Sequence, residues 1–171
     1  IHPNNRWIVT SGHDKRVQIW STFTGKKMRH WSPMDVPNGS KHVDLYKLHL
    51  DATGTFAATC AFDKSIRVYD FSTPSSPIFL QNLNMYQDQG YNHQGWLSPD
   101  GTKYVFGDET TGKQLKLCSV DASHELTIEK RFGTNYEDGS IAHNIVISNN
   151  FAYVAYYNEG LRIFDLRSPI P

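Results

Sequence analysis

The sequence predicts an all-β fold in which one short antiparallel sheet is repeated about four times. The first observation behind this prediction is a strand pattern that recurs at intervals of 49, 49 and 46 residues. The second is a tight-turn pattern that recurs in step with it. The third is that no window keeps the 3.6-residue apolar spacing of a helix beyond one turn. Repetition in two matched patterns indicates a repeat architecture.

The repeated strand alternates apolar and polar residues, which is the period of a strand with one buried face. Its four copies are residues 17–21, 66–70, 115–119 and 161–165. The repeated turns are rich in Pro, Asn, Asp and Gly, which supply the backbone angles that tight hairpins need. They occupy residues 2–5, 51–54, 98–101 and 148–150. An aromatic-rich strand follows each turn, so the unit is a hairpin, a third strand and a looser outer strand.

A unit of 46 to 49 residues with four short strands is typical of a β-propeller blade. We therefore predict a β-propeller segment of about four blades, each a four-stranded antiparallel sheet, with incomplete terminal blades. The first turn begins at His2, so the first blade is expected to lack its inner strand. The last blade is expected to lack its outer strand.

The composition excludes several classes of partner. The 171 residues carry 17 basic and 17 acidic side chains, and this balance argues against a nucleic-acid or membrane-surface binder, which usually needs a basic face. No apolar stretch is long enough to span a bilayer. The compartment is left open, with a cytoplasmic location expected for recombinant expression. Cys60 and Cys118 lie in strand patterns and are expected to be buried free thiols, a single disulfide being the alternative.

Residues 1–73 resemble WD-repeat blades, on the strength of residues 11–20 and 61–70. The resemblance implies that two aspartates cap the turns between the second and third strands, and that His, Thr and Asp form a network in the second blade. The chain departs from the family pattern at Ser21, where Asp is usual, and at Tyr69, where Trp is usual. The residues expected in this structural blade network are Asp14, Trp20, His42, Thr59, Asp63 and Tyr69.

Residues 78–171 resemble the LVIVD-repeat propellers of bacterial choice-of-anchor B proteins, which are usually predicted surface or secreted proteins of poorly defined activity, and the LVIVD-like blades are expected to occupy residues 74–171. The resemblance rests on residues 91–101, 140–145 and 160–166. A Ser/Pro-rich stretch at 71–77 separates the two kinds of blade, which are expected to form one structural unit. Two explanations stay open: an engineered or recombinant chimera of two half-propellers, or a natural propeller whose blades diverged.

One polar constellation suggests chemistry. His93 and His143 lie 50 residues apart, each near the start of an inner strand in adjacent blades. Asp108 and Glu159 follow the second strands of the same blades. Two imidazoles and two carboxylates facing one channel would make a mixed N/O metal site. Alternatively, each histidine forms hydrogen bonds within its own blade. The sequence lacks Gly-x-Ser-x-Gly, and we expect no cofactor and no enzyme activity.

The function predicted first is a non-enzymatic propeller scaffold or a self-assembling half-propeller. An open stack of blades exposes apolar faces and strand edges, both costly in water. The expected partner is a second copy that closes a ring about a twofold axis, or another propeller half. A protein or peptide ligand is the further possibility, with the loop at 32–42 as a binding surface. Two alternatives stay open: a metal-binding or catalytic propeller, and a fragment of a larger protein-interaction propeller.

Overall fold

The computed structural model describes residues 1–31, 45–61, 63–134 and 139–168, and in these residues fourteen strands form four antiparallel sheets. The strands are β1 (Trp7–Ser11), β2 (Val17–Ser21), β3 (Lys27–Trp31), β4 (Leu45–Leu50), β5 (Phe56–Ala61), β6 (Ile66–Asp70), β7 (Ile78–Leu83), β8 (Asn92–Leu97), β9 (Lys103–Asp108), β10 (Leu115–Val120), β11 (Leu126–Phe132), β12 (Ala142–Ser148), β13 (Phe151–Tyr156) and β14 (Gly160–Asp165). The predicted fold class is confirmed.

Each sheet is a meander of consecutive strands, and we call the sheets blades 1 to 4. Blade 1 is β1-β2-β3, blade 2 is β4-β5-β6-β7, blade 3 is β8-β9-β10-β11 and blade 4 is β12-β13-β14. Within the described residues, blades 1 and 4 have three strands and blades 2 and 3 have four, as the repeat predicts. No helix in the described part of the chain has the length and apolar character needed to cross a bilayer.

The turn before β1, β5, β9 and β13, which are equivalent strands of the four blades, contains left-handed backbone. The residues with positive φ at these four equivalent positions are Asn5, Gly54, Gly101 and Asn149. Asparagine and glycine adopt this conformation at the lowest cost, which explains why the turn pattern recurs in the sequence. The turn chemistry therefore sets where each hairpin begins.

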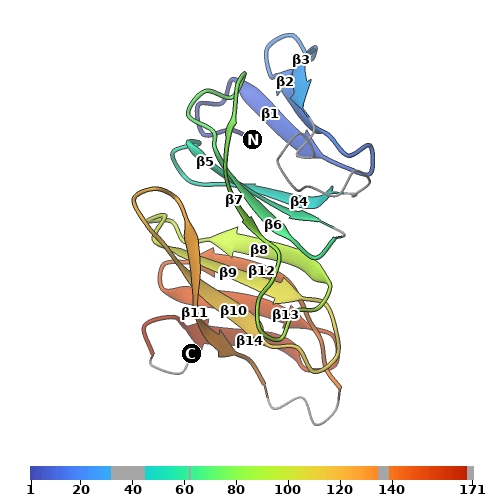
Figure 1. Ribbon diagram of the computed structural model, residues 1–171, viewed down its shortest axis with the longest axis vertical. Helices are drawn as coiled ribbons and strands as arrows, with labels where there is room; N and C mark the ends of the chain where they lie inside the picture. Colours follow the sequence, from blue (N-terminus) through green and yellow to red (C-terminus); the bar gives the residue numbers. More distant parts are fainter. Residues whose placement is uncertain (32–44, 62, 135–138, 169–171) are drawn as a thin grey trace.

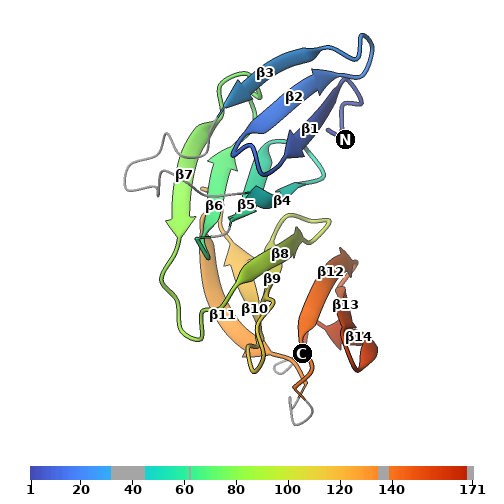
Figure 2. The same ribbon diagram turned by 90° about the vertical axis from the view of Figure 1, so that its right-hand side faces the viewer.

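The blades are stacked in chain order, from β1 at one end of the molecule to β14 at the other (Figure 1). Inner strands β4, β8 and β12 lie on one side of the stack, and outer strands β7 and β11 lie on the other (Figure 2). Strand β8 contacts both β4 and β12. This is the radial arrangement of propeller blades, with the inner strands toward the axis.

The core lies between blades, because each blade buries a face against its neighbour. In β9, Phe106 packs into the cluster shared with blade 2, whereas the preceding residue, Val105, packs into the cluster shared with blade 4. Blade 3 is therefore apolar on both faces, and five of the six residues of β9 are buried. Alternating side chains of one strand thus hold two neighbouring blades.

Two buried or half-buried glutamines tie neighbouring blades together. Gln94 of β8 donates from Nε2 to the Ile145 carbonyl at 2.8 Å, and its Oε1 accepts from the Ile145 amide at 2.5 Å. Gln81 of β7 makes the same pair of bonds to Leu126 of β11, at 2.9 and 2.8 Å. Each amide side chain satisfies one donor and one acceptor on the next blade. The sequence patterns did not predict these clamps.

Both cysteines are free and buried, so the expectation of unpaired thiols is confirmed and the disulfide alternative is wrong. Burial raises the pKa of Cys60 to about 12 and also raises the pKa of Cys118. Cys60 lies 3.6 Å from the hydroxyl of Tyr104. A Cβ atom on Gly95 would meet that hydroxyl at 2.2 Å, so glycine is required where Tyr104 crosses β8.

His49 lies where the first three blades meet. A cavity of about 290 Å³ is lined there by Ile1 and Val9, by residues 47–50 of β4, and by Trp96. The His49 ring packs against Trp96 with centroids 4.5 Å apart. Burial, reinforced by the charge of Lys47, lowers the pKa of His49 from 6.5 to about 4.

The shifted pKa of His49 predicts acid sensitivity. Between pH 6.5 and about 4 the unfolded chain protonates this imidazole and the folded chain does not, so the free energy of unfolding falls as the pH falls. The His49 contribution amounts to at most about 3 kcal/mol over this window. His49→Phe keeps a ring on Trp96. We expect this variant to lose less free energy of unfolding between pH 7 and pH 4.5 than the unmodified chain, as measured by urea unfolding at both pH values. An unchanged pH dependence in this variant would contradict the assignment.

Candidate functional site

Two β-bulges shape the beginning of the inner strands of blades 3 and 4. The register between β8 and β9 shifts between Asn92 and Gln94, and His93 is the residue inserted there. The register between β12 and β13 shifts between Ala142 and Ile145, which encloses His143. A bulge redirects a side chain out of the regular alternation of the strand. The same structural device therefore presents both predicted histidines.

The two imidazoles lie together and share one carboxylate. Their ring centroids are 4.5 Å apart, with the planes inclined by 30°. Nδ1 of His93 is 3.2 Å from Oε2 of Glu109, and Nε2 of His143 is 3.6 Å from Oε1 of the same residue. All three side chains are half-buried; the histidines lie near the start of inner strands β8 and β12, and Glu109 directly follows β9. The chain thus concentrates two nitrogen ligands and one carboxylate at the joint between blades 3 and 4.

Burial and charge act together at this cluster. Desolvation is the largest influence and lowers the pKa of His93. The nearby charge of Glu109 and a side-chain hydrogen bond with Asn144 oppose this effect, and His143 reinforces it. The hydroxyl of Tyr157 donates a hydrogen bond to Oε1 of Glu109, and this bond raises the pKa of Tyr157. The Tyr157 ring also meets the His143 ring edge-on, with centroids 5.3 Å apart. Tyr157 therefore orients the carboxylate and covers one imidazole.

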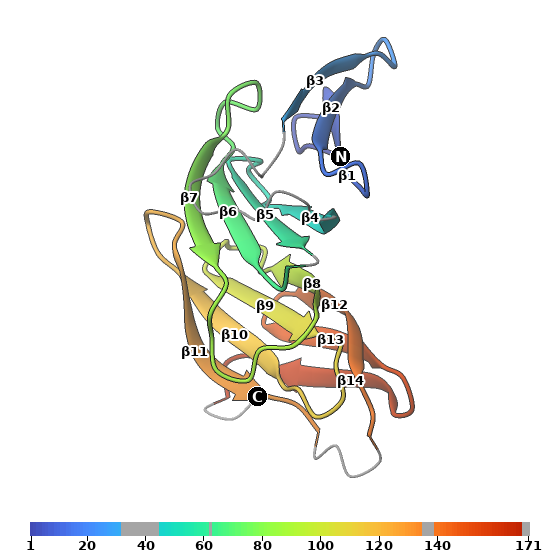
Figure 3. The same cartoon turned by 45° about the vertical axis from the view of Figure 1, so that its right-hand side comes forward.

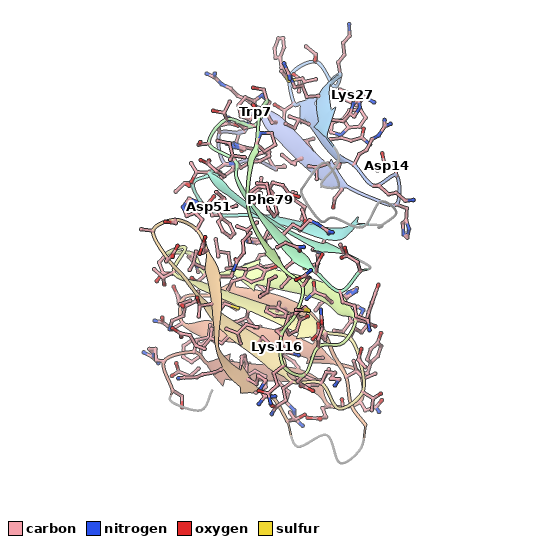
Figure 4. The ribbon with its side chains drawn as sticks, viewed as in Figure 1. Trp7, Asp14, Lys27, Asp51, Phe79 and Lys116 are labelled. Atoms are coloured by element: carbon pink, nitrogen blue, oxygen red, sulfur yellow. The ribbon has the colours of Figure 1, made fainter. Side chains whose placement is uncertain are left out.

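Asp108 lies in a separate buried network. Its Oδ2 accepts from the ammonium of Lys116 at 2.7 Å and from the Gly90 amide at 3.0 Å. Its Oδ1 accepts from the hydroxyl of Tyr86 at 2.8 Å. Lys116, labelled in Figure 4, is fully buried in blade 3 and also donates to the Asp88 carbonyl at 2.9 Å. These bonds secure the connection from β7 to β8, which runs along blade 3 before entering β8 (Figure 3).

The Asp108–Lys116 pair is one of four equivalent pairs. In every blade, the second residue of the repeated strand pattern bonds an acidic residue of the preceding hairpin turn or strand end. The four bonds are Gln18–Asp14 at 2.6 Å, Arg67–Asp63 at 2.5 Å, Lys116–Asp108 at 2.7 Å and Arg162–Glu159 at 2.9 Å. Each pair closes the equivalent hairpin of its own blade. The four pairs are therefore a polar repeat that accompanies the apolar one.

Of the four predicted ligands, the structure brings only the two histidines together. Glu159 bonds Arg162 and accepts from the Thr134 hydroxyl at 2.6 Å, and Asp108 bonds Lys116. The carboxylate between the imidazoles is Glu109, which sequence reasoning missed. The register within each blade supplies the signal. Asp108 pairs with Asn92 in blade 3 and Tyr156 pairs with Ala142 in blade 4, so the residues that follow, Glu109 and Tyr157, occupy equivalent positions.

Three residues of the predicted WD-like network form hydrogen bonds within the hairpins of blades 1 and 2. Asp14 accepts from the Arg16 amide at 3.2 Å and Asp63 accepts from the Ser65 amide at 3.1 Å. The Trp20 indole donates to the Thr10 hydroxyl at 3.1 Å.

The other three residues of the predicted network are Thr59, Tyr69 and His42. Thr59 is fully buried in β5, and the Tyr69 ring meets Phe79 edge-on at 5.9 Å. His42 and the predicted binding loop at 32–42 lie outside the described residues.

Comparison with known proteins agrees with this architecture. The family model "WD domain, G-beta repeat" matches residues 1–21 and 35–70. The family model "LVIVD repeat" matches residues 139–169. The chain is a β-propeller segment. Neither model covers residues 71–138, so the change of blade type near residues 71–77 stays a prediction.

Two curated relatives are WD repeat-containing protein 62 of Sus scrofa, at 35% identity, and of Mus musculus, at 33% identity. Each match extends over 71 residues, which is 42% of this propeller segment and 4% of the relative. The segment therefore spans a small part of the relatives that it matches.

Loss of the buried cation in blade 3 should be costly. We expect Lys116→Met to lower the free energy of unfolding by about 3–5 kcal/mol, because Asp108 is left as a buried charge without its ion-pair partner. Lys113→Met, which breaks a more exposed pair with Asp88, should cost less than about 1 kcal/mol. Urea unfolding of both variants measures the difference. Equal losses would show that Asp108 is not held by Lys116.

Proposed function

We propose that the protein is a non-enzymatic interaction scaffold whose terminal blades bind further propeller blades, with a second copy of the chain as the first partner. The coarse role agrees with the propeller fold and with the WD-repeat match. The observation that supports this choice of partner is the free face of blade 4.

The free face of blade 4 is apolar and exposed. Val146, Leu161 and Ile163 are exposed by 44%, 63% and 57%. Strand pairing aligns Val146, Tyr153 and Ile163 in one row across the sheet. The alternate residues of the same strands, including Ile145 and Val154, form the core against blade 3. A blade with two apolar faces is built to lie between two neighbours, as blade 3 does.

The free face of blade 1 is also partly apolar. Ile8 is exposed and pairs across the sheet with Trp20, whereas Val9 and Ile19 pack toward blade 2. The terminal blades are incomplete in different ways, because blade 1 has the counterparts of β5 to β7 and blade 4 has the counterparts of β8 to β10. Two copies related by a twofold axis would make an eight-bladed ring, within the range of about four to eight blades seen in propellers.

The nucleophile chemistry of the chain supports a non-enzymatic role. Burial raises the pKa of both cysteine thiols, which opposes formation of the reactive thiolate. The sequence also has no Gly-x-Ser-x-Gly elbow. Binding through the apolar blade faces is therefore the activity that the geometry favours.

Association through the free face of blade 4 has a direct test. Light scattering on a size-exclusion column should give a mass near twice 19.5 kDa for the unmodified chain. Ile163→Glu places a charge in the exposed apolar row and should shift the mass to that of one chain. Phe23→Glu, which changes an even more exposed apolar residue in a turn, should leave the mass doubled. A compact single-chain species for the unmodified protein would contradict the proposal.

A further inference from the structure

We propose that His93, Glu109 and His143 form a Zn²⁺ site that bridges blades 3 and 4. The proposal goes beyond the scaffold role and is independent of it. It rests on the donor set, on the spacing of the donor atoms, on one buried nitrogen and on the surrounding hydrogen bonds.

The donor set fits a borderline divalent metal. Two imidazole nitrogens and one carboxylate are a ligand combination found in zinc sites, with water as the fourth ligand. Mg²⁺ and Ca²⁺ prefer sites made of oxygen donors, and one carboxylate does not provide such a site. The chemistry of the three side chains therefore favours Zn²⁺ over these hard cations.

The spacing of the donor atoms suits tetrahedral coordination. Two ligands that each lie about 2.1 Å from a metal at the tetrahedral angle are about 3.4 Å apart. The distance from Nδ1 of His93 to Oε2 of Glu109 is 3.2 Å and the distance from Nε2 of His143 to Oε1 is 3.6 Å, so each imidazole has one carboxylate oxygen near this spacing. One ligand atom from each of the three residues lies within 4.8 Å of the others, so small side-chain rotations complete the geometry.

By hydrogen-bond geometry, Nδ1 of His93 is buried without a partner among the described residues, while the side chain of Asn144 contributes a hydrogen bond to the His93 ring that raises its pKa. Nδ1 faces Oε2 of Glu109, yet the 3.2 Å contact lacks hydrogen-bond geometry. Buried polar atoms are nearly always paired, and an unpaired one requires an explanation. A cation between this nitrogen and the carboxylate would satisfy both atoms at once.

The surroundings hold the ligands as a metal site requires. The Tyr157 hydroxyl bonds the carboxylate of Glu109, which is the outer hydrogen bond that commonly orients a metal ligand. The preceding residue, Asp108, is anchored by Lys116, so the backbone that presents Glu109 is secured. The blade repeat does not by itself require histidine at the bulge, because the equivalent shift in blade 2 encloses Tyr46.

The site has a structural consequence. His93 and Glu109 come from blade 3 and His143 comes from blade 4, so a bound metal joins the two blades. A metal that binds only the folded chain stabilises it in proportion to the logarithm of metal concentration over the dissociation constant. Zinc binding and the stability of this joint are therefore coupled.

Isothermal titration of the chelator-treated full chain with ZnCl₂ tests the site. We expect one Zn²⁺ per chain, and no binding of Mg²⁺ at the same concentration. His93→Gln, Glu109→Gln and His143→Gln should each weaken zinc binding by more than about tenfold, and Tyr157→Phe by about tenfold. His30→Gln, which alters an exposed histidine of β3, should leave the affinity unchanged.

Thermal unfolding provides the second readout and shows that each variant is folded. Zn²⁺ should raise the midpoint of the unmodified chain and of His30→Gln, and leave the midpoints of the three ligand variants unchanged. Tyr157→Phe keeps every ligand, so its weakened binding tests the site even if a ligand variant does not fold. The proposal would be overturned if the unmodified chain did not bind zinc. It would also be overturned if His93→Gln and His143→Gln bound zinc as tightly as the unmodified chain.

Discussion

The packing of one blade face on the next is the interaction on which the rest of this structure depends. A sheet of three or four short strands buries too little surface to be stable by itself, so each blade needs a neighbour. Strand β9 shows how this is achieved, because Val105 packs toward blade 4 and Phe106 packs toward blade 2. The glutamine clamps add direction to this apolar contact: Gln94 and Gln81 bond the backbone of the next blade and set how the two sheets are aligned.

The candidate site follows from this packing. His93 and His143 are remote in sequence and belong to different sheets, and they meet because β8 lies beside β12. The Gln94 clamp is next to His93 in the chain, and it bonds Ile145, two residues from His143. The same contact that holds blades 3 and 4 together therefore sets the distance between the two imidazoles.

Much of the fold was predictable because the repeat is local. Turn residues such as Gly54 and Asn149 have positive φ, and the strand alternation follows from a buried face, so both leave a periodic trace in the sequence. The site was predictable only in part. Both histidines could be identified from their equivalent positions, but Asp108 and Glu109 are adjacent, and only the register of β8 against β9 shows which of them faces the imidazoles. Bulges and clamps between blades depend on partners about 50 residues away, which alternation along one strand does not show.

Native-state hydrogen exchange of the β13 amides tests most directly whether one blade depends on its neighbour's face. Val105→Ala removes two methyl groups from blade 3 on the face that packs against blade 4. If face packing holds blade 4, the opening free energy of the β13 amides should fall by more than about 1 kcal/mol, together with that of β9. If the opening free energy of the β13 amides is unchanged while that of the β9 amides falls, blade 4 does not depend on the face of blade 3, and the central role of face packing is contradicted.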